Sequence, residues 1–201
     1  MNRIVIYTLL IFSTNAQAQQ MTIDVLHPDN SSGINGKNNI VIYLSGKIDS
    51  RAANRLKTTL TKLPSSKNGY DFVLNSPGGL VYTGIEIGRY IRSLPKSRTY
   101  IGQPHGKLNH NNLAASLRSG SCESACSLAF LGGQQRYIPK SSRYGVHQFY
   151  TENLIPRHDD ISLAQIATAD IVTYLNEMGV DSNLISEMAY TDKNKMRYLT
   201  Q

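Results

Sequence analysis

A Pro-Gly-Gly corner at residues 75–79 (NSPGG) constrains the fold of this chain more than any other segment. It separates a short strand-like run at 70–74 from a stretch at 80–93 that has apolar residues at helical spacing. Glycine permits the tight backbone of a strand-to-helix turn. Such a turn leaves backbone N–H groups bare at the start of the helix, where they stabilise an anion or an oxyanion. The segment therefore predicts an α/β unit whose corner is either a plain turn or part of a site.

The alternation of strand and helix patterns continues on both sides of this corner. A β-branched run at 40–44 predicts a buried strand, helical spacing follows at 52–63, and another strand pattern lies at 98–101. This order is typical of an α/β domain with parallel strands. The polar segment at about 102–120 breaks the rhythm, and we expect it to be a surface insertion beside the site.

The chain is expected to form a single domain, because 201 residues suffice for one hydrophobic core. We expect a signal peptide at 1–18, an N-terminal edge segment and loop at 19–39, and the α/β domain at 40–201. Near the end, the apolar spacing predicts a long amphipathic helix at 160–179 and a shorter helix after Asp181.

The first residues have the pattern of a secretory signal peptide. One positive charge at Arg3 precedes an apolar run at 4–12, and Ala16 and Ala18 occupy the small-residue positions of a cleavage site. The run is too short to cross a bilayer as a permanent helix. We expect cleavage after Ala18, a periplasmic or secreted location, and no integral membrane segment after cleavage.

Charge and composition argue against several classes of function. The net charge is +7, but the lysines and arginines are scattered and form no basic stripe with interleaved aromatic residues. We therefore expect a solvated surface and no nucleic-acid partner. The chain has no HExxH motif and no paired Cys-x-x-Cys motif, and His105 and His110 lack a third clustered ligand. We expect neither a metal ion nor another cofactor.

Cys122 and Cys126 are the two cysteines of the chain. Export would permit a disulfide between them. A bridge requires close Cα atoms, so it fits only if Cys122 precedes the helix that contains Cys126. The sequence leaves a bridge and two free thiols as equal alternatives.

Ser124 and His147 are the residues best suited to catalysis. Ser124 precedes a run of small residues in a predicted helix at about 123–131, and His147 lies in an apolar strand pattern at 145–149. A hydroxyl nucleophile, an imidazole base and a glycine-built oxyanion hole are the parts that acyl transfer needs. Without that chemistry, Ser124 would be a plain helix N-cap and His147 a core histidine.

The order of these motifs resembles that of the ClpP/crotonase superfamily, and within it the proteolytic subunit of Clp protease and its exported, ClpP-like relatives. In chain order, the matching segments are the first strand and helix (40–63), the oxyanion-hole corner (75–84), the nucleophile helix (124–131) and the segment that ends in His-Gln (136–148). Together they span most of the chain after the expected signal peptide. The resemblance implies a single-domain spiral of ββα units.

The same resemblance implies a serine peptidase in which Ser124 is the nucleophile and His147 the general base. The oxyanion donors would be the backbone N–H groups of Gly78 and Ala125, with Gly79 completing the corner. The implied substrate is a peptide or an unfolded protein segment. The crotonase branch acts on acyl-CoA thioesters instead, which an exported protein would not meet.

Several residues leave alternatives open. The family's late aspartate falls near 191–195, where Asp192 is the only carboxylate and Asn194 could also orient an imidazole. Ser116, in an Ala-Ala-Ser triplet, imitates the nucleophile motif, although bulky residues follow it. A Ser/Lys dyad with Lys140 in place of the histidine is a further interpretation.

Two implications concern the whole molecule rather than single residues. A catalytically degenerate, ClpP-like peptide-binding module is the alternative to an active peptidase. ClpP-like proteins use the helix that corresponds to 160–179 between subunits, so the resemblance also implies a homo-oligomer.

Overall fold

The computed structural model describes residues 19–26, 39–109, 112–149 and 160–199. The expected signal peptide at 1–18 and the expected loop at 27–38 lie outside these residues. Within the described ranges the chain is a mixed α/β domain, as its sequence predicts, and no helix there combines the length and apolar character needed to cross a membrane.

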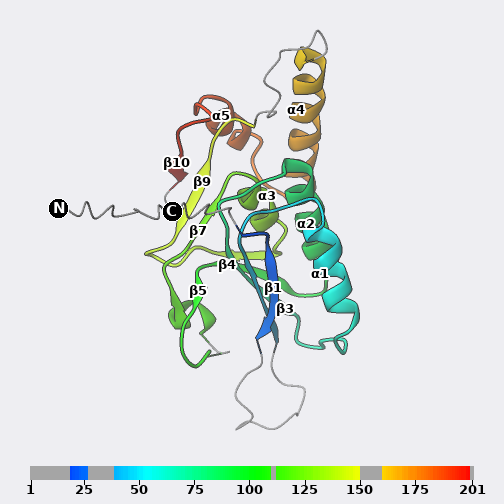
Figure 1. Ribbon diagram of the computed structural model, residues 1–201, viewed down its shortest axis with the longest axis vertical. Coiled ribbons are helices and arrows are strands. Elements are labelled where there is room, and N and C mark those ends of the chain that lie inside the picture. Colours follow the sequence, from blue (N-terminus) through cyan, green and yellow to red (C-terminus); the bar gives the residue numbers. More distant parts are fainter. Residues whose placement is uncertain (1–18, 27–38, 110–111, 150–159, 200–201) are drawn as a thin grey trace, which may run out of the picture.

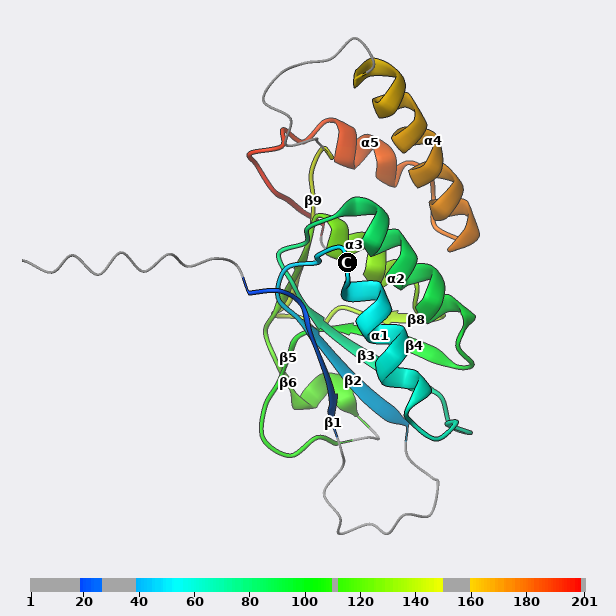
Figure 2. The same cartoon turned by 45° about the vertical axis from the view of Figure 1, so that its right-hand side comes forward.

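Five strands form the central sheet, in the order β1-β2-β3-β4-β8. Figure 1 shows this sheet at the centre of the molecule, and Figure 2 labels all five of its strands. Strands β2, β3, β4 and β8 are parallel, and β1 pairs antiparallel with β2 at the edge, where the sequence predicts an edge strand. The strands are β1 (Thr22–Leu26), β2 (Ile40–Ser45), β3 (Tyr70–Asn75), β4 (Ser97–Ile101) and β8 (Gln135–Tyr137).

Three helices cover one face of this sheet (Figure 2). They are α1 (Ala52–Thr61), α2 (Val81–Ser93) and α3 (Ala125–Leu131). Ile42, Leu44, Phe72 and Leu74 project toward them at alternate positions of β2 and β3 and are fully buried. This layer is the main hydrophobic core, and the crossover helices place the carboxyl ends of the strands beside the start of α2.

Helices α2 and α3 lie unusually close together because glycine stands where they meet. A Cβ on Gly84 of α2 would lie 2.4 Å from the carbonyl oxygen of Ala125, and a Cβ on Gly132 would lie 2.2 Å from that of Gly88. Such separations leave no room for a side chain. The close contact fixes the first turn of α3 against the helix that follows the Pro-Gly-Gly corner.

The segment 102–120 covers the opposite face of the sheet. It contains β5 (Gln103–Pro104), the short helix η1 (Leu113–Ser116) and β6 (Leu117–Arg118). Leu113 of this segment packs with Val41, Val73 and Tyr100 in a second, smaller core. The segment is therefore more than the expected surface insertion, because it buries the apolar side chains that point away from α1, α2 and α3.

A second sheet joins the carboxyl end of β3. It has the order β10-β9-β7, made of β10 (Arg197–Leu199), β9 (Arg143–Val146) and β7 (Ser121–Glu123). Strands β7 and β9 are parallel, and β10 is antiparallel to β9. Ser76, just after β3, donates its N–H to the carbonyl of Ser121 at 2.8 Å and accepts the N–H of Glu123 at 3.0 Å. These bonds bring the corner at 75–79 against β7.

The long helix α4 (Asp160–Glu177) is followed by α5 (Leu184–Ala189). Ile171 and Tyr174 in the carboxyl half of α4, and Met178 directly after it, are buried in the main core. In contrast, Leu163 and Ile166 nearer its start are 50% and 55% exposed. Figure 1 shows that part of α4 extending beyond the other helices. The apolar face predicted for this helix is therefore core in one half and surface in the other.

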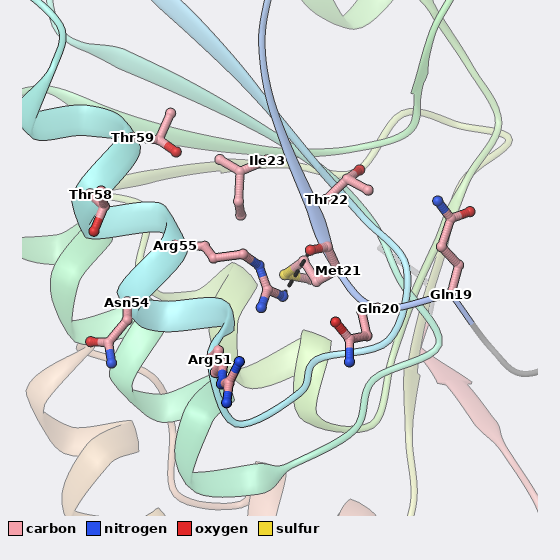
Figure 3. Close-up of a pocket in the computed structure, with 10 residues that line it drawn as sticks. All are labelled: Gln19, Gln20, Met21, Thr22, Ile23, Arg51, Asn54, Arg55, Thr58 and Thr59. Atoms are coloured by element: carbon pink, nitrogen blue, oxygen red, sulfur yellow. Dashed lines mark hydrogen bonds between the residues drawn. The ribbon is translucent and has the colours of Figure 1, made fainter.

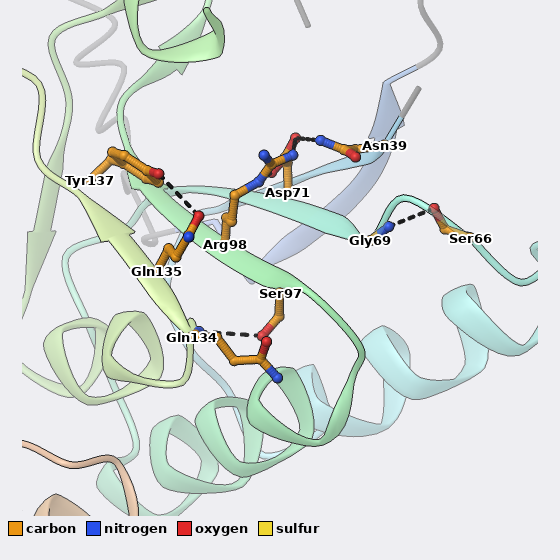
Figure 4. A network of polar contacts seen from close by, with 9 residues as sticks. All are labelled: Asn39, Ser66, Gly69, Asp71, Ser97, Arg98, Gln134, Gln135 and Tyr137. Atoms are coloured by element: carbon orange, nitrogen blue, oxygen red, sulfur yellow. Dashed lines mark hydrogen bonds and ion pairs between the residues drawn. The ribbon is translucent and has the colours of Figure 1, made fainter. Parts of the chain in front are cut away.

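A polar network lies at the amino ends of β3 and β4 (Figure 4). Asp71 is 1% exposed and forms a two-point ion pair with the guanidinium of Arg98, with Nη2 at 2.9 Å from Oδ2. Asn39 donates to the same carboxylate at 2.9 Å. The buried charge is thus paired and hydrogen-bonded, as burial requires.

Candidate active site

Ser124 occupies a sharp strand-to-helix turn between the end of β7 at Glu123 and the start of α3 at Ala125. Its backbone has φ 55° and ψ −127°, which residues other than glycine rarely adopt. A backbone held in such a region costs about 1–3 kcal/mol, and sites of this kind cluster in active sites. The hydroxyl makes no capping hydrogen bond to α3, so Ser124 is not the plain helix N-cap that the sequence offers as the alternative to a catalytic role.

Backbone hydrogen bonds hold this turn from both sides. The N–H of Ser124 donates to the carbonyl of Gly145 in β9 at 3.0 Å. The carbonyl of Ser124 accepts from Ser127 twice, from its N–H at 2.9 Å and from its hydroxyl at 2.6 Å. The peptide groups of Ser124 are therefore engaged, while no described residue is hydrogen-bonded to its side-chain hydroxyl.

The Pro-Gly-Gly corner packs directly against Ser124. A Cβ on Gly78, whose φ is 94°, would lie 2.6 Å from the Cβ of Ser124 and 2.5 Å from the carbonyl oxygen of Glu123. On the other side, the carbonyl of Gly78 accepts the N–H of Ile48 at 2.7 Å, and a Cβ on Gly79 would lie 2.2 Å from the carbonyl oxygen of Ile48. Only glycine fits both positions, and its absence of a side chain brings backbone amides next to the serine.

The two expected oxyanion donors differ in their hydrogen bonding. The N–H of Ala125, at the first position of α3, has no acceptor within the described part of the chain. The N–H of Gly78 donates to the hydroxyl of Ser76 at 3.1 Å. The amide of Ala125 therefore lacks an acceptor among the described residues, whereas the amide of Gly78 is engaged by Ser76.

His147 follows directly after β9. Its Nδ1 lies 2.6 Å from the carbonyl oxygen of Gln148, which can only accept a hydrogen bond. Nδ1 is therefore the donor of this hydrogen bond, and in the neutral imidazole Nε2 then carries the lone pair that a general base needs. Gln148 is itself fixed, since its N–H donates to the carbonyl of Thr191 at 2.9 Å and its side-chain amide donates to that of Ala189 at 2.6 Å.

The parallel pair β7 and β9 brings Ser124 and His147 to the same end of the second sheet. Glu123 is opposite Gly145 in this register, and the hydrogen bond from Ser124 to Gly145 continues it. Both residues therefore leave their strands on the same side, at the carboxyl ends. The structure packs Gly78 against Ser124 and Ala125, and the strand register places His147 at the same end of the sheet.

The third expected triad member, Asp192, is hydrogen-bonded within its own turn and not to His147. Its carboxylate is exposed and accepts the N–H of Asn194 at 2.9 Å within a turn. The Nδ1 atom of His147 faces the carbonyl of Gln148 instead. The orienting group that the sequence reasoning missed is thus a backbone carbonyl of the neighbouring residue, and its one signal in the sequence is the His-Gln pair.

The two rival residues lie in other places. Ser116 belongs to η1, where its hydroxyl accepts the N–H of Asn109 at 2.9 Å and donates to the carbonyl of Asn112 at 3.4 Å. This serine stabilises the loop. Lys140 is exposed in the turn before β9, at the amino end of the strand pair, whereas Ser124 lies at the carboxyl end.

A disulfide joins Cys122 and Cys126, with their Cα atoms 5.1 Å apart. Cys122 lies in β7 and Cys126 in α3, so the first cysteine precedes the helix as a bridge requires. This resolves the alternative that the sequence left open. Within the described residues, no three His, Cys, Asp or Glu side chains gather as a metal ion would need.

A groove of about 760 Å³ lies elsewhere, between β1 and α1 (Figure 3). Arg55 crosses it, donating to the carbonyl of Met21 at 2.9 Å and to the carboxylate of Asp49. This contact holds the pKa of Asp49 at about 2. Because no serine, cysteine or histidine lines the groove, it offers none of the groups that the site at Ser124 assembles.

Comparison of the chain with models of known protein families and with curated proteins gives no match. The function proposed below therefore rests on the geometry around Ser124 and on the resemblance of the motif order.

Proposed function

We propose that this protein is an exported serine peptidase of the ClpP-like type that hydrolyses peptides or unfolded protein segments. Ser124 is its nucleophile, His147 its general base, and the N–H groups of Ala125 and Gly78 form its oxyanion hole. The proposal includes the ClpP/crotonase-like spiral of ββα units as the fold and removal of residues 1–18 on export. The disulfide is compatible with that location.

One observation carries the proposal. Ser124 is held at φ 55° between a strand and a helix, with its hydroxyl uncommitted among the described residues, against a glycine that no other residue can replace. A serine in a merely structural role would cap the helix and relax its backbone. Retaining an unfavourable conformation with an idle hydroxyl is typical of a nucleophile presented on a strained turn.

The arrangement supports a two-step acyl transfer. The Ser124 oxygen attacks the substrate carbonyl and its proton passes to Nε2 of His147, while the N–H of Ala125 binds the oxyanion. His147 then gives the proton to the leaving amine. A water molecule, deprotonated by the same nitrogen, attacks the acyl-serine, and the proton returns to Ser124 as the peptide acid leaves.

Labelling with a fluorophosphonate probe, which reacts with activated serines, tests the proposal. We expect the oxidised protein to be labelled, and Ser124→Ala and His147→Ala each to abolish labelling, by about a thousandfold or more. The double variant should be no worse than either single one, since each alone disables attack. Ser116→Ala is the matched control and should label at the original rate. Loss of labelling in Ser116→Ala but not in Ser124→Ala would place the nucleophile in the segment 102–120.

A catalytically degenerate peptide-binding module is the second candidate. It is favoured by the position of Asp192, whose carboxylate is hydrogen-bonded to Asn194 rather than to His147, and by the engaged N–H of Gly78. Binding of an unfolded polypeptide without probe labelling would support this candidate over the peptidase.

Assembly is a separate part of the proposal. The exposed apolar residues Leu163 and Ile166 on the free half of α4 are the residues through which we propose a homo-oligomer. Ile171, on the same face, is fully buried in the subunit's own core and takes no part in it.

A further inference from the structure

The disulfide spans the candidate nucleophile. Cys122 is the second residue of β7 and Cys126 the second residue of α3, so the bridge closes a small ring that contains Glu123, Ser124 and Ala125. Each half of the ring is anchored: β7 is hydrogen-bonded to Ser76, and α3 rests on the glycines of α2. The bridge is the covalent link between these anchored parts across the strained turn.

Such a short bridge stabilises the folded state less than a bridge across a long loop would. A disulfide stabilises mainly by restricting the unfolded chain, and the restriction decreases with the length of the loop that it closes. Here the bridged residues are separated by four positions. The main effect of the bond is therefore on local geometry, at the turn where Ser124 has φ 55°.

Without the bond, the turn has a route to relax. Two reduced sulfurs repel each other to van der Waals separation, which exceeds the length of a covalent bond, and both cysteines are 0% exposed in a packed core. The core would therefore separate β7 from α3 at this point. That movement lets the backbone of Ser124 return toward an ordinary conformation and shifts its oxygen relative to the N–H of Ala125.

We propose that the Cys122–Cys126 disulfide is a positioning element for the nucleophile: it holds the Ser124 turn in the conformation that reacts. The inference rests on the proposed peptidase function and adds to it. Because both sulfurs are buried, small reductants do not reach the bond in the folded protein, and its state is set while the chain folds. The site then reaches its full rate only in a chain that has folded in an oxidising compartment.

The test compares the fluorophosphonate labelling kinetics of the oxidised protein with those of Cys122→Ala, Cys126→Ala and the double variant. We expect the maximal labelling rate per folded molecule to fall between about tenfold and a hundredfold, because displacements near 1 Å at a reacting group have effects of that size. The probe concentration at half-maximal rate should stay unchanged. The three variants should lose the same amount, since each lacks the same bond.

Ile91→Val, a truncation in the same core far along α2, is the matched control and should reduce stability without reducing the labelling rate. Equal rates in the oxidised protein and in folded bridge-free variants would overturn the positioning role. The positioning role would also be overturned if the double variant lost as much rate as the two single variants combined. In that case the loss of side-chain packing, and not the loss of the bond, would be responsible.

Two further outcomes are informative. If the alanine variants do not fold, two other proteins replace them. One is Cys122→Val/Cys126→Ala, in which valine fills the space in β7, and the other is the unaltered chain folded in the presence of a dithiol reductant. Recovery of the rate when that reduced protein is unfolded, reoxidised and refolded supports the inference, and a native circular dichroism spectrum with the bond re-formed but without recovery overturns it. Absence of labelling in the oxidised protein itself would instead refute the proposed function, and this inference with it.

Discussion

The amino ends of β3 and β4 differ from the turn after β7, which lies beside the carboxyl end of β3, in how their polar groups are paired. At the amino ends, Asp71 and Arg98 bury a pair of charges in which each partner is satisfied by hydrogen bonds. In the turn after β7, Ser124 has an unusual backbone conformation. Among the described residues, its hydroxyl has no hydrogen-bond partner and the N–H of Ala125 has no acceptor. At the amino ends the polar groups are paired with one another, whereas near Ser124 some polar groups are left for a substrate to pair with.

The comparison teaches which end is available for chemistry. In open α/β sheets, ligands bind outside the carboxyl ends of the strands, where loops and helix starts present backbone N–H groups. The network at Asp71 closes the other end with side chains. Substitutions at the two ends should therefore separate activity from stability.

Gly78→Ala should have the largest effect on activity. The added Cβ would lie 2.6 Å from the Cβ of Ser124, so the turn must move, and we expect the fluorophosphonate labelling rate to fall by about a hundredfold or more. Gly106→Ala is the matched control, because Gly106 also has a positive φ, of 61°, but no atom within 4 Å of its added Cβ. An unchanged rate in folded Gly78→Ala would mean that the corner is not part of the site.

Asp71→Asn should show the reverse behaviour. It leaves the partly buried guanidinium of Arg98 without its carboxylate, and we expect the free energy of unfolding in urea to fall by about 3 kcal/mol. The labelling rate per folded molecule should not change. Glu177→Gln, which removes the exposed partner of Arg89, is the control and should cost less than about 1 kcal/mol. A fall in the labelling rate per folded molecule of Asp71→Asn would contradict the expectation that substitutions at this end change stability and not activity.

Asp192→Ala should have the smallest effect. Because Nδ1 of His147 faces a backbone carbonyl, removal of this carboxylate should lower the labelling rate by less than about tenfold, well below the loss in His147→Ala. A loss equal to that in His147→Ala, in a folded protein, would make Asp192 a full triad member. No loss at all would leave orientation of the imidazole to the carbonyl of Gln148.

The local parts of this fold could be predicted from the sequence. The alternation of patterns identifies β2, β3, β4, α1 and α2 because each of these elements is set by short-range periodicity and bounded by Gly or Pro. The candidate residues Gly78 and Ser124 were also found from local signals, a corner before a helix and a serine before small residues.

The long-range parts could not be predicted in the same way. The segment 102–120 has a polar composition, and its role in covering Val41 and Val73 depends on contacts between segments far apart in the chain. The periodicity of α4 gives one apolar face, but the division into buried Ile171 and exposed Ile166 depends on where the rest of the molecule ends. The partner of His147 was missed because a backbone carbonyl leaves no mark on residue identity.

The close contact between α2 and α3 has a consequence for anyone who scans this protein by mutation. Gly84 and Gly88 lie on α2, and a methyl group at Gly84 would collide with the carbonyl of Ala125, while one at Gly88 would lie 1.9 Å from the hydroxyl of Tyr174. The first substitution would displace α3, and with it the N–H of Ala125 that we propose as an oxyanion donor. The second would press on Tyr174 of α4, whose hydroxyl donates to the carbonyl of Leu128 in α3. In a functional screen these two glycines would score like members of the catalytic machinery, although their whole contribution is the absence of a side chain.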